Sequence, residues 1–140
     1  MNKFPSCILN VSAIIQASMG STRLPGKVLK DLHGRPLLSF MVERIRRSKF
    51  INEIIVATTT NKEDIQIENL CKSINIKCIR GSENDVLLRF IQCLKETDSK
   101  ILIRLTADCP LIDPLIIDTL ITKFKKDNLE YASNILPPTF

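Results

Sequence analysis

The chain has 140 residues, of which 44% are hydrophobic and 25% are charged, a balance typical of one globular domain rather than a disordered chain. Its net charge of +5 comes from dispersed Lys and Arg side chains, and this distribution does not single out a nucleic-acid partner. No apolar run approaches the ~18 residues of a membrane span, and the N-terminal stretch lacks the apolar core of a signal peptide. We therefore expect a cytoplasmic protein that binds neither nucleic acid nor membrane.

The cysteines and the single histidine narrow the choice of chemistry. The 5 Cys residues show no C-x-x-C spacing, and Cys71, Cys78 and Cys93 lie among Ile and Leu. A thiol in such surroundings packs like a small hydrophobic side chain, so we expect core packing rather than disulfides or zinc. His33 is the only histidine, which excludes a multi-histidine metal centre and argues against a Ser-His-Asp triad. It precedes Gly34 in a polar segment, where we expect an exposed turn.

Apolar runs rich in β-formers alternate with helical patterns along the chain. Strands are expected over residues 11–17, 53–58, 75–80 and 101–105, with the start of a fifth over 130–133. Helices are expected over residues 37–45, 67–74, 85–97 and 114–124. This alternation predicts an α/β fold, with a mostly parallel sheet and helices on both of its faces. Ligands of such sheets bind beyond the carboxyl ends of the strands, so the loops there are the places to search.

Helix-start signals accompany three of these helices. Pro36 suits the first turn of the first helix, because its missing N–H would have no intrahelical partner there. Thr60 and Glu63 form a capping-box pattern ahead of the second helix. Asp113 and Pro114 supply an N-cap and a first helical residue for the last helix. The third helix carries an apolar stripe on one face, formed by Val86, Leu87, Phe90, Ile91 and Leu94.

The most informative segment is the loop after the first strand, from Gln16 to Lys27. Gly20 and Gly26 let the backbone approach a ligand closely, and free N–H groups in such a loop bind anions. Arg23 offers parallel donors to a phosphate group, and Lys27 offers a point charge. A simple connection between a strand and a helix does not need this combination, so we predict a phosphate-binding loop.

The P-loop of kinases and NTPases, G-x-x-x-x-G-K-[ST], is the obvious rival interpretation. In this chain five residues rather than four separate Gly20 from Gly26. Val28 follows Lys27, where a P-loop has the hydroxyl group that binds magnesium. The P-loop interpretation therefore fails.

Acidic residues follow the strands at two further places. Asp108 comes directly after the fourth strand, where a carboxylate beside a triphosphate can hold Mg²⁺ while waters and phosphate oxygens complete the octahedron. It is equally open from these residues alone that the Asp108 carboxylate only accepts a hydrogen bond from its own loop backbone. Helix capping is sufficient to explain Asp113 before Pro114, so we assign Asp113 a structural role. Asp85 lies in the first turn of the third helix, where the helix dipole favours any acid, and both capping and ligand contact stay open.

Three segments together resemble one enzyme family. The loop Ile15–Leu29, IQASMGSTRLPGKVL, is similar to the signature loop of the cytidylyltransferases, which include the acylneuraminate and 3-deoxy-manno-octulosonate enzymes. The segments Gly81–Leu87, GSENDVL, and Arg104–Asp113, RLTADCPLID, are similar to the subgroup named for spore coat polysaccharide biosynthesis protein F. The likeness runs from about Val11 to Phe140, with the motifs in the same order.

The resemblance implies a Rossmann-like nucleotide-diphospho-sugar transferase fold. It also implies a Mg²⁺-dependent reaction in which a sugar-acid hydroxyl attacks the α-phosphate of CTP, giving a CMP-sugar for surface polysaccharide and pyrophosphate. By motif position, Arg23 and Lys27 would hold the triphosphate and Asp108 the metal. The other implied nucleotide contacts are Gln16, Ala17, Ser18, Met19, Gly20, Asp85, Arg89 and Arg104. Such a transfer depends on positioning and charge neutralisation, so it needs no histidine base.

Two departures from the family pattern bear on activity. Ser18 stands where the family often has Arg, which removes one possible cation. Family members also continue well beyond the position of Phe140, and their second half supplies a second acidic metal contact, the sugar site and the dimer arm. We therefore expect residues 1–140 to be the nucleotide-binding part of a single truncated domain, homodimeric when whole and prone to self-association or poor solubility as a fragment. The alternatives are a catalytically inactive nucleotide-binding paralogue and a small basic nucleic-acid-binding protein, and the second explains the loop less well.

Overall fold

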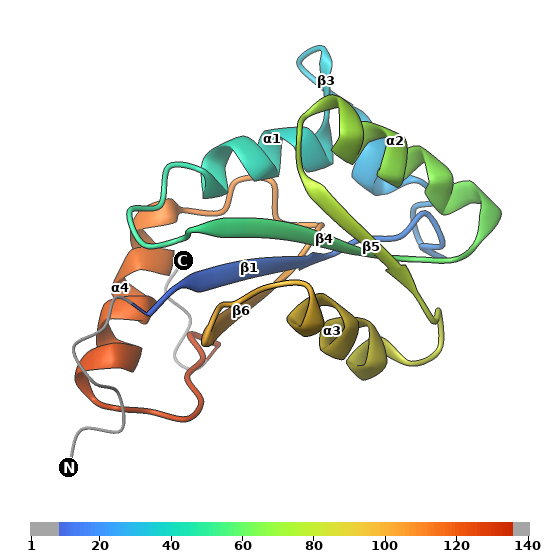
Figure 1. The fold of residues 1–140 in the computed structure, drawn as a ribbon. Helices are drawn as coiled ribbons and strands as arrows, with labels where there is room; N and C mark the ends of the chain where they lie inside the picture. Colours follow the sequence, from blue (N-terminus) through green and yellow to red (C-terminus); the bar gives the residue numbers. More distant parts are fainter. Residues whose placement is uncertain (1–8, 136–140) are drawn as a thin grey trace.

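A computed structural model describes residues 9–135, and its centre is a four-stranded sheet (Figure 1). The strands are β1 (Val11–Gln16), β4 (Glu53–Thr59), β5 (Lys77–Gly81) and β6 (Ile101–Thr106). They lie in the order β5-β4-β1-β6 and every pair is parallel. The carboxyl ends of all four strands therefore lie along one edge of the sheet.

Helices lie between successive strands of this sheet and after its last strand. They are α1 (Leu37–Ile45), α2 (Ile65–Ser73), α3 (Val86–Lys95) and α4 (Pro114–Lys126), with short 3₁₀ turns η1 (Lys27–Leu29) and η2 (Lys62–Asp64). Strands β2 (Asp31–Leu32) and β3 (Arg35–Pro36) form a separate two-stranded hairpin. His33 and Gly34 make its turn, and both have positive φ, of 52° and 80°, as a two-residue hairpin turn of this hand requires. His33 is exposed, as the sequence predicted.

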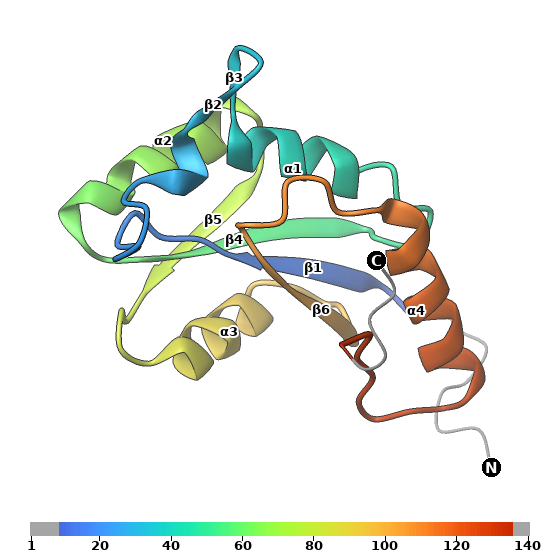
Figure 2. The ribbon, with the colours of Figure 1, turned by 180° about the vertical axis from the view of Figure 1, so that it is seen from behind.

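The sheet separates two apolar clusters of unequal size. Helices α1, α2 and α4 contribute to the larger cluster, whereas α3 alone covers the opposite face with Cys93 and Phe90. Figures 1 and 2 show α1 and α2 on one side of the sheet and α3 on the other. Side chains alternate along a strand, so Ile15 of β1 packs in the larger cluster and its neighbour Ile14 in the smaller one. The predicted α/β architecture, with a parallel sheet and helices on both faces, is confirmed.

The predicted apolar stripe of α3 is wrong in part. Leu87 and Ile91 are 71% and 39% exposed, while Arg89 and Cys93 are buried. Gly81 contributes to this packing, because an added Cβ there would lie only 2.7 Å from Cγ of Arg89. The missing side chain lets α3 lie close against β5. Helical periodicity therefore predicted an apolar face that includes Leu87 and Ile91. In the structure the methylene stem of Arg89 packs against the sheet, and those two side chains are exposed.

The predicted capping box is also wrong. Asn61 precedes η2 and makes no side-chain cap. The hydroxyl of Thr59, rather than that of Thr60, accepts a hydrogen bond from the Asn61 N–H at 3.1 Å. Glu63 lies inside η2, and the helix α2 begins after Asp64. The acidic residue that organises this turn is Asp64, as described below.

Two smaller predictions differ from the structure. Pro36 is the residue before the first helical residue of α1 rather than a member of its first turn. Residues 130–133 form no strand, and Phe140 lies outside the described residues.

Three of the thiols pack in the core as predicted, whereas Cys109 is free and exposed. Cys71, Cys78 and Cys93 are free and belong to the two apolar clusters, and Cys7 lies outside the described residues. Burial raises the pKa of the Cys93 thiol to about 11, so this thiol stays protonated at neutral pH. None of the helices in residues 9–135 is long and apolar enough to cross a membrane.

Candidate functional site

The candidate site lies where the loops after β1 and β6 meet. The register pairs Gln16 of β1 with both Ala57 of β4 and Thr106 of β6. Two further backbone bonds extend this pairing, from Ala17 N–H to the Ala57 carbonyl and from Ala107 N–H to the Gln16 carbonyl, each at 3.0 Å. The loops that begin at residues 17 and 107 therefore start side by side at the centre of the sheet edge.

The peptide group of Met19 organises the first loop. Its carbonyl accepts hydrogen bonds from the N–H groups of Ser21, at 2.9 Å, and Gly26, at 3.0 Å, and so draws the two ends of the loop together. Gly26 has φ 67°, and an added Cβ would lie 3.2 Å from the Met19 side chain. A glycine is thus needed at this position for both its backbone conformation and the space. Gly20 is exposed at the loop surface, and Ser18 is half-buried.

Two of the predicted charged groups of the site meet across the sheet edge. Nζ of Lys27, at the start of η1, lies 3.2 Å from Oδ2 of Asp108, 81 residues later in the chain. Both side chains are accessible, with exposed fractions of 29% and 47%. A ligand can therefore reach both groups. An anion could replace Asp108 as the partner of the lysine, and a cation could replace Lys27 as the partner of the carboxylate.

The environment of Asp108 favours its charged form. A side-chain hydrogen bond from Thr106 and, secondarily, the bond and charge of Lys27 hold the pKa of Asp108 below its usual value. An ionised carboxylate is the form that binds a hard divalent cation. No group of three or more His, Cys, Asp or Glu side chains suited to a metal occurs within residues 9–135. Asp108 thus fits Mg²⁺ as one carboxylate ligand, with the remaining ligands to come from phosphate and water.

Arg104 belongs to the same edge but to the face that α3 covers. Its Nη2 lies 3.4 Å from Oε1 of Gln16, and its guanidinium carbon stands 5.4 Å from the centre of the Phe90 ring. Arg104 and Gln16, both predicted contacts, are therefore neighbours. Arg23 is exposed near the outer part of the loop and forms no hydrogen bond or ion pair with the residues that the structure describes.

Asp85 and Arg89 do not lie together on an open surface. The Asp85 carboxylate caps α3 by accepting a hydrogen bond from the Leu88 N–H at 2.8 Å. Arg89 is only 3% exposed, and its Nε and Nη1 have no partner among the described residues. The capping role of Asp85 is observed, while a nucleotide contact for either residue stays a prediction. Asp113 caps α4 through the Leu115 N–H at 2.8 Å, which confirms its structural assignment.

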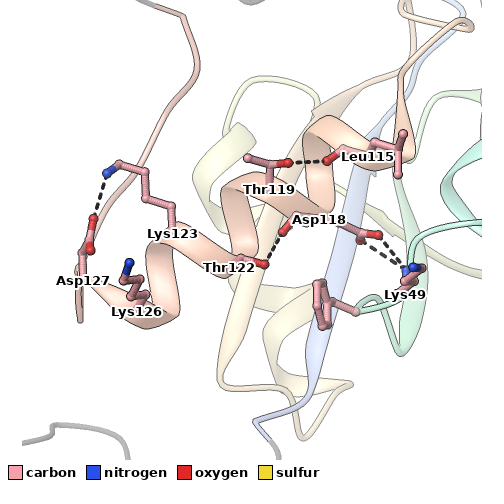
Figure 3. A pocket seen from close by; sticks show the side chains of 9 residues that line it. Lys49, Leu115, Asp118, Thr119, Thr122, Lys123, Lys126 and Asp127 are labelled. Atoms are coloured by element: carbon pink, nitrogen blue, oxygen red, sulfur yellow. Dashed lines mark hydrogen bonds and ion pairs between the residues drawn. The ribbon is translucent and has the colours of Figure 1, made fainter.

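A groove lies elsewhere on the molecule. It has a volume of about 680 Å³, and the side chains of Lys49, Phe50, Leu115 and Lys123 are among those that line it (Figure 3). It runs along the outer side of α4 beside the segment that precedes β4, at the amino ends of the strands. A groove of this volume is a second place where a ligand could bind. The pair of Lys27 and Asp108, from the loops after β1 and β6, lies at the opposite, carboxyl edge of the sheet.

Sequence reasoning missed Asp64, which contacts the first loop directly. Its Oδ1 accepts a hydrogen bond from the Met19 N–H at 2.7 Å, although 45 residues separate the two. The signal for it was an acidic residue in the first turn after a strand, which the capping-box interpretation assigned to Glu63. It also missed Glu83, whose Oε1 would lie 3.9 Å from a Cβ placed on Gly20.

Solved structures place this architecture in a known class. A cytidylyltransferase from Leptospira borgpetersenii superposes with a TM-score of 0.80 at 39% identity, over 85% of this chain and 50% of that one. The synthetase for CMP-2-keto-3-deoxy-manno-octonic acid, complexed with CTP, superposes with a TM-score of 0.76 at 28% identity, over 85% of this chain and 48% of that one. The fold is thus that of a nucleotidyltransferase.

Sequence comparison narrows the class to a family. The chain is 41% identical over 123 residues to the spore coat polysaccharide biosynthesis protein SpsF of Bacillus subtilis, covering 85% of this chain and 51% of that protein. It is 34% identical over 119 residues to the 8-amino-3,8-dideoxy-manno-octulosonate cytidylyltransferase of Shewanella pealeana, covering 81% and 47%. The cytidylyltransferase family profile matches residues 12–140, and the chain belongs to this family. It spans about half the length of these curated relatives.

The pKa of Asp108 provides a test of the site's electrostatics. Thr106→Val removes the leading stabilising hydrogen bond, so the pKa of Asp108 should rise toward its ordinary value, and Lys27→Met should raise it as well. Because the folded-state pKa is lowered, the associated stability is present at neutral pH and is lost as the pH falls through that pKa. NMR titration of the Asp108 carboxyl carbon measures both shifts. An unchanged pKa in both variants would contradict this description of the site.

Proposed function

We propose that this chain binds CTP with Mg²⁺ and transfers CMP to a sugar acid, with release of pyrophosphate, as a step in the synthesis of a surface polysaccharide. The choice of CTP and of a sugar acid rests on the cytidylyltransferase family and on the relatives named above. The observation that carries the proposal is the approach of Lys27 and Asp108 to 3.2 Å from two different strand ends. That pair gives the site one group for phosphate and one for a metal ion.

The proposed roles follow from charge and position. Arg23 and Lys27 neutralise the triphosphate, Arg23 as an exposed guanidinium with no partner to give up among residues 9–135 and Lys27 by leaving Asp108. Asp108 holds Mg²⁺, which supplies further charge neutralisation at the phosphates when bound. The oxygen of the sugar hydroxyl forms a new bond to the α-phosphorus and gives up its proton to solvent water. The bond from that phosphorus to the oxygen bridging the β-phosphate breaks, and pyrophosphate leaves with that oxygen. Catalysis then consists of positioning and electrostatic stabilisation.

The remaining contacts are proposed for the nucleoside part of CTP. The backbone of residues 17–20 follows β1 directly and so begins next to Gln16. The Arg104 side chain contacts the Gln16 side chain. We propose that these residues line the nucleotide. We propose that Asp85, which caps the amino end of α3, contributes to the same site. Arg89 reaches a nucleotide only if its buried guanidinium is exposed on binding.

A second candidate function is nucleotide binding without turnover. It is favoured by one observation, that within the part of the chain that the structure describes no three or more His, Cys, Asp or Glu side chains group together as a metal site. Formation of a CMP-sugar from CTP and a sugar acid separates the two candidates, since both predict CTP binding.

Nucleotide affinity tests the phosphate loop. Arg23→Ala and Lys27→Ala should each weaken CTP binding by about 1.5–3 kcal/mol, the range for hydrogen bonds to charged groups, or roughly tenfold or more in Kd. Isothermal titration calorimetry measures this effect, and Lys123→Ala, in the groove along α4, serves as a control that should leave the affinity unchanged. Unchanged affinity in both loop variants would remove the phosphate-binding assignment.

Magnesium dependence tests the metal ligand. Asp108→Asn keeps the shape of the side chain and removes its charge, so Mg²⁺ should no longer strengthen CTP binding. Asp113→Asn is the matched control, because Asn caps a helix about as well as Asp and the Leu115 N–H keeps an acceptor. Paired CTP titrations with and without Mg²⁺ measure the difference. A loss of the Mg²⁺ effect in Asp113→Asn and not in Asp108→Asn would reverse the assignment.

The exposed apolar surface leads us to propose self-association of residues 1–140. Leu87 and Ile91 of α3 are 71% and 39% exposed, Tyr131 is 79% exposed, and β6 is an edge strand with unpaired backbone groups. Light scattering after size exclusion should show oligomers, which Leu87→Lys with Ile91→Lys should reduce. Leu115→Lys on α4, at a residue 66% exposed, is the control. A monodisperse monomer at high concentration would contradict this proposal.

A further inference from the structure

The carboxylate of Asp64 is buried between the first loop and the end of β4. The residue is 1% exposed and lies at the end of η2, just before α2. Oδ1 accepts the Met19 N–H at 2.7 Å, and Oδ2 accepts the N–H of Thr59 at 3.2 Å as well as the Thr59 hydroxyl. Both oxygens are therefore used. Burying a carboxylate is unfavourable unless such bonds are made, so the arrangement ties the two segments together.

The bond to Met19 acts at the residue on which the loop closes. The Met19 N–H donates to Asp64, while the Met19 carbonyl accepts from Ser21 and Gly26. The N–H and the carbonyl of Met19 belong to successive peptide planes, so the bond to Asp64 fixes the first plane and the bonds from Ser21 and Gly26 fix the second. Asp64 thus holds the start and the end of the loop through a single residue.

The other side of Asp64 is anchored to the sheet. The Thr59 hydroxyl donates to Asp64 and accepts from Asn61, and the Arg80 side chain donates to the carbonyls of Thr59 at 3.0 Å and Asn61 at 2.8 Å. The Thr60 N–H donates to the Gly81 carbonyl at 3.0 Å. This polar network joins the ends of β4 and β5. The loop is therefore fastened to a rigid support through Asp64.

We propose that Asp64 is a positioning residue, which holds the loop after β1 in the shape that receives the nucleotide. This inference rests on the proposed function for its consequence in binding, but the holding of the loop is independent of any ligand. A loop that is ordered before binding loses less conformational entropy when the nucleotide arrives. Without Asp64 the Met19 N–H would lose its partner, and the loop would exchange among other conformations.

The chain offers a matched control in Asp118. This carboxylate is also buried, at 8% exposure, and accepts the Lys49 N–H at 3.0 Å together with the Ser48 hydroxyl. It ties α4 to the segment before β4, at the amino ends of the strands. Asp64→Ala and Asp118→Ala should therefore cost comparable stability, while only the first should release the loop.

Two readouts on the 140-residue chain test the proposal. In amide hydrogen exchange without ligand, Asp64→Ala should speed exchange at Met19, Ser21 and Gly26 at least about tenfold, and Asp118→Ala should not. In calorimetry with CTP and Mg²⁺, Asp64→Ala should raise Kd roughly ten- to hundredfold and Asp118→Ala little. Asp64→Asn should restore part of both, since its oxygen can still accept from Met19 while its amide donates to the Thr59 hydroxyl.

The outcomes separate the role of Asp64 from the proposed binding of CTP. Equal effects of the two Ala variants, or none in Asp64→Ala, would overturn the role of Asp64. If the unaltered chain fails to bind CTP, the proposed function is wrong, and hydrogen exchange alone still decides whether Asp64 holds the loop. If Asp64→Ala does not fold, the unaltered chain provides the test. Its Met19 amide should exchange at least about a hundredfold more slowly than in a free peptide, and an unprotected amide would contradict the proposal.

Discussion

The position of β1 between β4 and β6 is the constraint on which the site depends. Gln16 pairs with residues of both neighbours, and the backbone bonds of Ala17 and Ala107 continue the ladders beyond it. Two loops far apart in the sequence consequently leave the sheet next to each other. A central parallel strand with a neighbour on each side has this effect in any open α/β sheet, and a ligand then binds where the loops separate.

The charged side chains at this edge form an ion pair that a ligand can replace. Lys27 and Asp108 contact each other at 3.2 Å, and each remains partly exposed. A polyphosphate offers the lysine a more highly charged partner, and a divalent cation does the same for the carboxylate, so the two events favour each other. Exposed ion pairs contribute little to stability, and breaking this one is correspondingly inexpensive. Asp64 differs, because it is buried with both oxygens used and so serves the framework rather than the ligand.

The sequence predicted the strands and helices well, because apolar periodicity reflects the burial that forms them. It also predicted that Lys27 and Asp108 share one edge, because that follows from parallel topology. The face that α3 turns inward was not predictable from periodicity, since Arg89 packs by its stem where Gly81 leaves room. Asp64 was missed for a related reason. Its hydrogen-bond partner is the backbone N–H of Met19, 45 residues away. The residues next to Asp64 in the sequence carry no sign of such a distant contact.

We propose that the nucleotide binds at the carboxyl edge of the sheet rather than in the groove along α4. Chemical-shift mapping of the backbone amides during titration with CTP and Mg²⁺ tests this claim most directly. The largest changes should fall on residues 17–27 and 107–108, with small changes at Lys49, Leu115 and Lys123. Changes concentrated on those three groove residues, or none at the loop after β1, would contradict it.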